Sequence, residues 1–92
     1  MTLRKWLKPN AIQGTEDEVI AALTELAAEV AEHEKQFYFV PETFVEEWLE
    51  RPNAQLGGLE PTYYLGEPAS RGIAAGALVN DLRTLFATGK YR

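Results

Sequence analysis

The stretch WLERPNAQLGG, from Trp48 to Gly58, decides the fold because it ends a helix and turns the chain. Pro52 disfavours helical geometry at Arg51, so a helix that carries the tryptophan must end here. A near copy, WLKPNAIQG, runs from Trp6 to Gly14 but lacks the Gly-Gly pair and the proline that follow the later one. We interpret the early copy as a coincidental helix stop or a pseudo-repeat, and the later copy as a structural turn.

The later copy and its extension form a motif of turn-forming and apolar residues. Its positions are Trp48, Pro52, Asn53, Leu56, Gly57, Gly58 and Pro61. The asparagine can bond its own downstream backbone, and Leu56 can point into the core. The two glycines permit positive φ or the close approach of another helix, and Pro61 opens a further short helical turn.

Hydrophobic periodicity predicts helices on both sides of this turn. Apolar residues spaced four, three and four apart form one helical face: Val19, Leu23, Leu26 and Val30. A capping box at Thr15–Glu18 starts that helix. We therefore predict an all-α single domain, a small bundle of about four helices, near residues 15–36, 41–50, 61–65 and 70–88.

Local signals predict where these helices begin and end, and which residues they bury. Pro41 suits the first position of a helix, Ser70 is the expected N-cap of the last helix, and Gly89 is its expected C-cap. The predicted core consists of large apolar residues: Leu23, Leu26, Val30, Phe44, Trp48, Leu56, Leu82 and Phe86.

The charge of the chain argues against nucleic acid as a partner. Net charge is −5, and residues 1–46 hold nine acids against four bases. Phosphate binding needs clustered Lys and Arg, whereas the basic clusters here are small, at Arg4-Lys5-Lys8 and Lys90-Arg92. We also expect no membrane span, because no stretch approaches the ~18 apolar residues that a span needs. The absence of cysteine from a chain of 92 residues favours a cytoplasmic protein.

No catalytic constellation stands out in the sequence. His33 is the only histidine, and nothing near it resembles a triad or a metal site. The glycines match neither a P-loop nor a dinucleotide fingerprint. We therefore expect no catalytic residue, no metal and no cofactor. A small enzyme or enzyme subunit remains a third alternative, which a deep polar pocket would favour.

The second half of the chain resembles a known family. Trp48-Leu49, Pro52-Asn53, Leu56-Gly57-Gly58, Pro61 and Leu65 precede an apolar helix that closes with Gly89 and an aromatic residue. This order resembles the toxin-binding C-terminal domain of the Xre/MbcA/ParS antitoxins, over about residues 43–92. The usual N-terminal helix-turn-helix has no counterpart, because the first half lacks a basic recognition helix.

The resemblance implies a function and a set of partner-binding residues. Family members neutralise RES-type toxins, which consume NAD, and their C-terminal segment lies at the mouth of the toxin's NAD pocket. It implies that the chain docks and blocks such an enzyme through Gly89, Lys90, Tyr91 and Arg92, and we add Tyr63 and Tyr64 as candidate contacts. A homo- or hetero-oligomer is possible. The alternative is a non-enzymatic helical adaptor with another protein partner, supported by more aromatic residues than so small a core can bury.

Overall fold

The computed structural model describes residues 15–89, and the Trp6–Gly14 copy and the Lys90–Arg92 tail lie outside the described residues. The described elements are the α-helices α2 (Glu16–His33), α3 (Pro41–Leu49) and α4 (Pro68–Thr88), with the short 3-10 turns η2 (Ala54–Leu56) and η3 (Pro61–Tyr64). The all-α prediction is confirmed. The count of about four helices is not, because the short element at 61–65 is one 3-10 turn.

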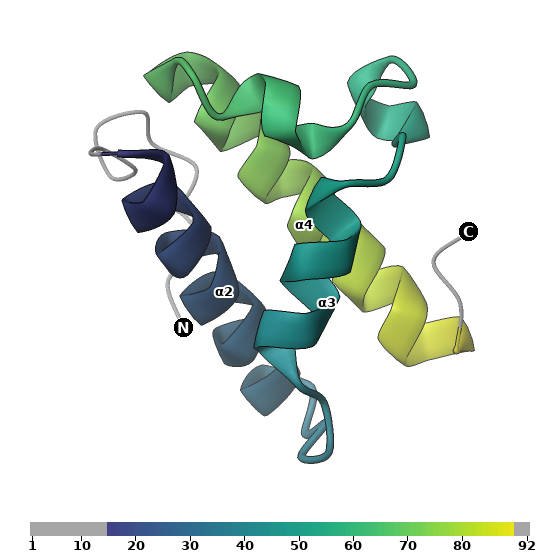
Figure 1. Ribbon diagram of the computed structural model, residues 1–92. Helices are drawn as coiled ribbons and strands as arrows, with labels where there is room; N and C mark the ends of the chain where they lie inside the picture. Colours follow the sequence, from purple (N-terminus) through teal and green to yellow (C-terminus); the bar gives the residue numbers. More distant parts are fainter. Residues whose placement is uncertain (1–14, 90–92) are drawn as a thin grey trace.

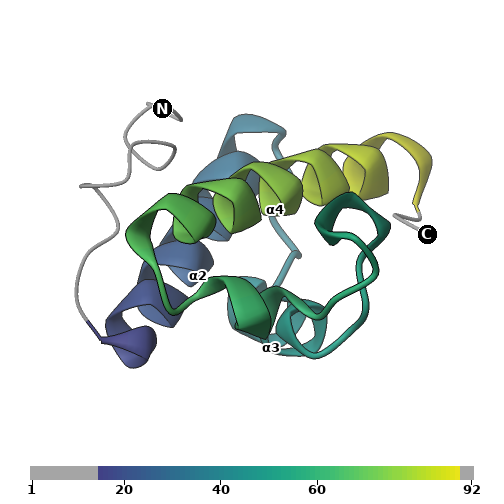
Figure 2. The same cartoon turned by 90° about the horizontal axis from the view of Figure 1, so that it is seen from above.

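The three α-helices pack around one small core. Helix α2 contacts both α3 and α4 (Figure 1). Seen from above, α4 runs across α2, and α3 lies below α4 in the view (Figure 2). Both η2 and η3 contact α4. The largest fully buried side chains come from every element: Val19, Leu23, Leu26, Val30, Val45, Trp48, Leu56, Pro61, Leu65, Leu78 and Leu82.

The predicted helix starts are confirmed at α2 and α3 and corrected at α4. The Thr15 hydroxyl accepts from the Glu18 amide at 3.3 Å, and the Glu18 carboxylate accepts from the Thr15 amide at 3.2 Å. Pro41 occupies the first turn of α3, as expected. Ser70 is not the cap of α4, because the helix already begins at Pro68, where a missing N–H leaves no bond unmade.

Helix α2 ends at His33, shorter than the prediction of residue 36, because Lys35 has a φ of 58°. The Lys35 amide donates to the Glu32 carbonyl and the Gln36 amide to the Ala31 carbonyl at 2.8 Å. This is a Schellman ending with lysine where glycine is usual. At the end of α4, Gly89 takes the predicted left-handed conformation, with a φ of 82°.

The predicted core is right at six positions and wrong at two. Phe44 and Phe86 are only partly buried and pack on the edge of the core. Phe39 lies between them, with ring centroids 5.4 Å from Phe44 and 5.1 Å from Phe86. These two phenylalanines lie at the start of α3 and near the end of α4, where the bundle closes with aromatic rings rather than with a full interior layer.

Candidate protein-binding site

The Pro-Asn turn, residues 52–59, is fixed to α4 by one buried carboxylate. Asp81 is 7% exposed, and its Oδ2 accepts from the Trp48 indole Nε1 at 2.7 Å and from Asn53 Nδ2 at 2.8 Å. Its Oδ1 accepts from Gln55 Nε2 at 2.6 Å. One acid on α4 therefore joins the end of α3, the turn and η2.

Sequence reasoning missed Asp81, although a signal for it existed. It lies in helical register with the buried residues Ala74, Ala77 and Leu78, so it falls on the core-facing side of α4. An acid in such a position needs hydrogen-bond donors, since burying an unpaired charge is very unfavourable. The indole and amide groups of the motif supply those donors from a distant part of the chain.

The internal bonds of the turn explain why the motif has its particular residues. The Asn53 side chain accepts from the Gln55 amide at 2.9 Å, as predicted, and the Asn53 amide donates to the Leu59 carbonyl at 3.0 Å. Gly57 and Gly58 have φ values of 69° and 82°, with nothing within 4 Å of an added Cβ. Positive φ, rather than close approach of another helix, is therefore the reason for the Gly-Gly pair.

A depression of about 460 Å³ opens beside the turn, lined by Trp48, Asp81 and residues 51–55. The described part of the chain contains no buried side-chain nitrogen or oxygen without a hydrogen-bond partner. It also contains no cluster of three or more acids or histidines able to hold a metal. Trp48, Asn53 and Gln55 all donate to Asp81, so this arrangement holds the turn against α4.

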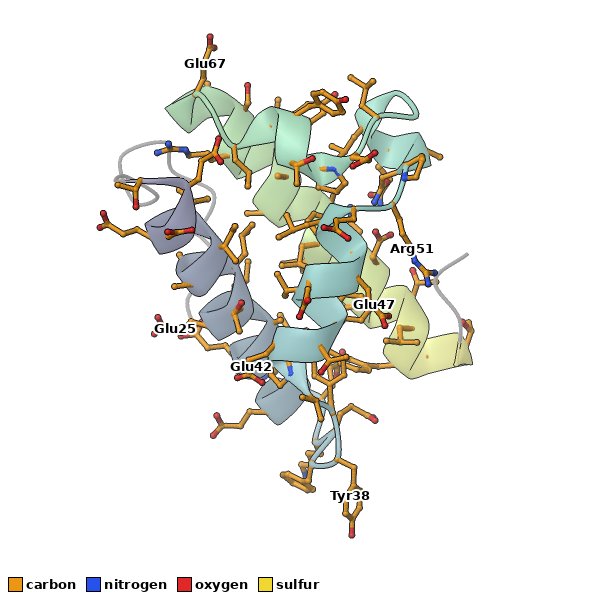
Figure 3. All side chains as sticks on the ribbon, viewed as in Figure 1. Glu25, Tyr38, Glu42, Glu47, Arg51 and Glu67 are labelled. Atoms are coloured by element: carbon orange, nitrogen blue, oxygen red, sulfur yellow. The ribbon has the colours of Figure 1, made fainter. Side chains whose placement is uncertain are left out.

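A second region exposes large aromatic side chains to solvent. We call it the aromatic end, and its members are Phe37, Tyr38, Phe39, Leu85, Phe86 and Gly89, which line a hollow of about 490 Å³ with Lys35 and Gln36. Phe37 is 78% exposed and Tyr38 is fully exposed. Figure 3 shows Tyr38 projecting from the extreme end of the molecule. The loop after α2 therefore presents two rings beside the end of α4.

The predicted partner-binding residues are divided between two places. Gly89 belongs to the aromatic end, and the three residues after it lie beyond the described part. Tyr63 lies on η3 and is 72% exposed. The η3 turn contacts α4, and Arg71 near the beginning of α4 donates from Nε to the Leu65 carbonyl. Tyr64 is partly buried, and its hydroxyl donates to the Leu56 carbonyl at 2.9 Å. The two tyrosines are thus not beside Gly89.

Comparison with protein-family models, with characterised proteins and with solved structures finds no match for this chain. None of the described helices is long and apolar enough to cross a membrane.

Proposed function

We propose that this protein is a non-enzymatic binding module that docks onto a larger enzyme through its aromatic end and inhibits it. The observation that supports this most is the exposure of Phe37 and Tyr38, at 78% and 100%, beside Gly89. Exposed rings gathered next to a hollow are typical of protein interfaces, where aromatic anchors carry much of the binding energy.

The resemblance to the antitoxin family supplies the kind of enzyme. We propose a RES-type toxin that consumes NAD, with the aromatic end providing affinity and the following Lys90-Tyr91-Arg92 providing inhibition. A cationic, aromatic tip suits a pocket that otherwise binds a pyrophosphate and a flat base. Because the tip follows directly after the C-cap of α4, docking of the aromatic end would bring it to the partner's surface.

The second candidate is a helical adaptor with a different partner. It is favoured by Leu59 and Tyr63, which are 48% and 72% exposed and belong to the turn and η3 rather than to the aromatic end. A partner that bound there would leave the C-terminal tip uninvolved. The two functions therefore predict different surfaces.

The test is binding of a RES-type toxin, sought first among the products of neighbouring genes, measured by calorimetry. The variants are Tyr38→Ser and, as a control that makes the same change at another exposed tyrosine, Tyr63→Ser. Loss of an interface anchor should weaken binding by about tenfold or more for Tyr38→Ser and little for Tyr63→Ser. The reverse order would move the interface to the η3 side, and an absence of binding by the unaltered chain would reject the RES-type partner.

A further inference from the structure

A groove between α2 and α3 combines an apolar floor with an acidic rim. It has a volume of about 460 Å³ and is separate from the aromatic end. Its lining residues are Ile20 and Thr24 from α2, Val45 and Leu49 with Glu42 and Glu46 from α3, then Glu50 and Thr62. No described basic side chain lines it. We call it the acidic groove.

The three glutamates of the rim form one row along α3. Glu42, Glu46 and Glu50 are spaced four residues apart, so they lie on the same side of the helix over about 12 Å. All three are exposed. Figure 3 shows Glu42 at the beginning of α3 on the side toward α2, whereas Glu47 lies on another side of the helix. The carboxylates therefore border the floor rather than pointing away from it.

This row of carboxylates is electrostatically unfavourable for helix α3. Like charges four residues apart repel, and the C-terminal end of a helix favours cations over anions. Helix α3 has no basic residue in its last turn, and Glu46, Glu47 and Glu50 are at or near that end. A local arrangement that disfavours the isolated helix is expected where a ligand later relieves it. The ligand that would relieve it is cationic.

We propose that the acidic groove binds a short cationic, amphipathic segment of a partner protein. An aliphatic side chain of that segment packs against Ile20, and Lys or Arg side chains at helical spacing pair with the glutamate row. A second copy of this chain is disfavoured as the occupant, because its net charge of −5 repels the same groove. The proposal uses residues outside the aromatic end, so it does not depend on the proposed function.

The groove predicts weak, salt-sensitive binding. Val45 and Leu49 are already 1% and 5% exposed, so a ligand covers little new apolar surface beyond Ile20. Ion pairs at an exposed rim are screened by salt and act mainly on specificity and on the association rate. Affinity should therefore fall steeply as the ionic strength rises.

The experiment titrates the full chain with a labelled synthetic peptide that has a leucine stripe beside lysines at i, i+4 and i+8. Glu46→Lys reverses the charge at the centre of the row. Glu47→Lys is the matched control, because it makes the same charge change on α3 at a residue that does not line the groove. At low salt, Glu46→Lys should weaken binding by about tenfold, and Glu47→Lys much less. Equal loss in both variants would show a general charge effect and overturn the proposal.

A second measurement locates the peptide and identifies competing occupants. In NMR spectra of the full chain, the peptide should shift the methyl resonances of Ile20, Val45 and Leu49, and shifts confined to other residues would contradict the proposal. The chain's own Arg4 and Lys5 provide an alternative source of positive charge. If Arg4→Glu with Lys5→Glu shifts those methyl resonances without peptide, an intramolecular occupant replaces the partner segment.

Discussion

Replacing Asp81 with alanine should strongly destabilise the fold, because three donors lose their acceptor together. The Trp48 indole lies on a side chain that is 1% exposed, so its N–H would lack any partner, which costs about 1–3 kcal/mol. Asn53 and Gln55 are less buried and can turn toward water, so each loses about 0.5–1 kcal/mol. The expected total is about 2–5 kcal/mol.

The assay is urea unfolding monitored by far-ultraviolet circular dichroism. Tryptophan fluorescence is not suitable as the probe, because the substitution itself changes the environment of Trp48. For a domain of this size, the expected loss corresponds to a fall in Tm of about 8–40 °C. Asp81→Asn keeps the volume and one acceptor oxygen, so it should lose only about 1–2 kcal/mol. Trp48→Phe removes the indole donor. In a double-mutant cycle of Trp48→Phe with Asp81→Ala, the coupling energy should be about 1–2 kcal/mol.

A small effect would refute this reasoning. If Asp81→Ala unfolds with an unchanged m-value and a loss below about 1 kcal/mol, then the carboxylate does not hold the turn to α4. If Trp48→Phe and Asp81→Ala prove additive, the 2.7 Å bond between indole and carboxylate contributes nothing to stability.

Three further predictions follow from the core, the turn and the charge. Trp48→Ala should lower the free energy of unfolding by about 3–5 kcal/mol in the same assay, and a loss below about 1 kcal/mol would contradict its burial. Gly57→Ala should cost about 1–2 kcal/mol from positive φ alone, whereas Gly57→Asn should cost less, and equal losses would point to steric contact instead. The chain alone should not shift DNA at sub-micromolar concentration and physiological salt in a mobility assay, because its net charge of −5 opposes phosphate, and a shift would overturn that expectation.

The parts of the fold that the sequence predicts well are those set by neighbouring residues. The capping box at Thr15, the proline start of α3 and the glycine end of α4 each depend on a few adjacent positions. The sequence predicts the end of α2 too late, because Lys35 adopts a left-handed conformation that lysine rarely takes. The sequence predicts the start of α4 too late, because Ser70 is a typical N-cap residue whereas Pro68, which occupies the first turn, reads as a break.

The parts that sequence reasoning missed depend on contacts between distant segments. The Asp81 bonds join α4 to residues at the end of α3 and in the turn, and the sequence alone does not pair them. The aromatic end is similar, because the contact between Phe39 and Phe86 exists only once α2, α3 and α4 have packed. The surplus of aromatic residues was visible in the sequence, but which of them gather beside Gly89 was not.

The measurement that tests the proposed function most directly is the NAD-consuming activity of a RES-type toxin, sought first among the products of genes beside the one that encodes this chain. The enzyme is assayed alone, with the full chain, and with a chain that lacks Lys90-Tyr91-Arg92, while binding is followed in parallel. If the C-terminal tip blocks the active site, the full chain inhibits, whereas the shortened chain still binds through the aromatic end but no longer inhibits. Equal inhibition by both chains, or none by either, would contradict it.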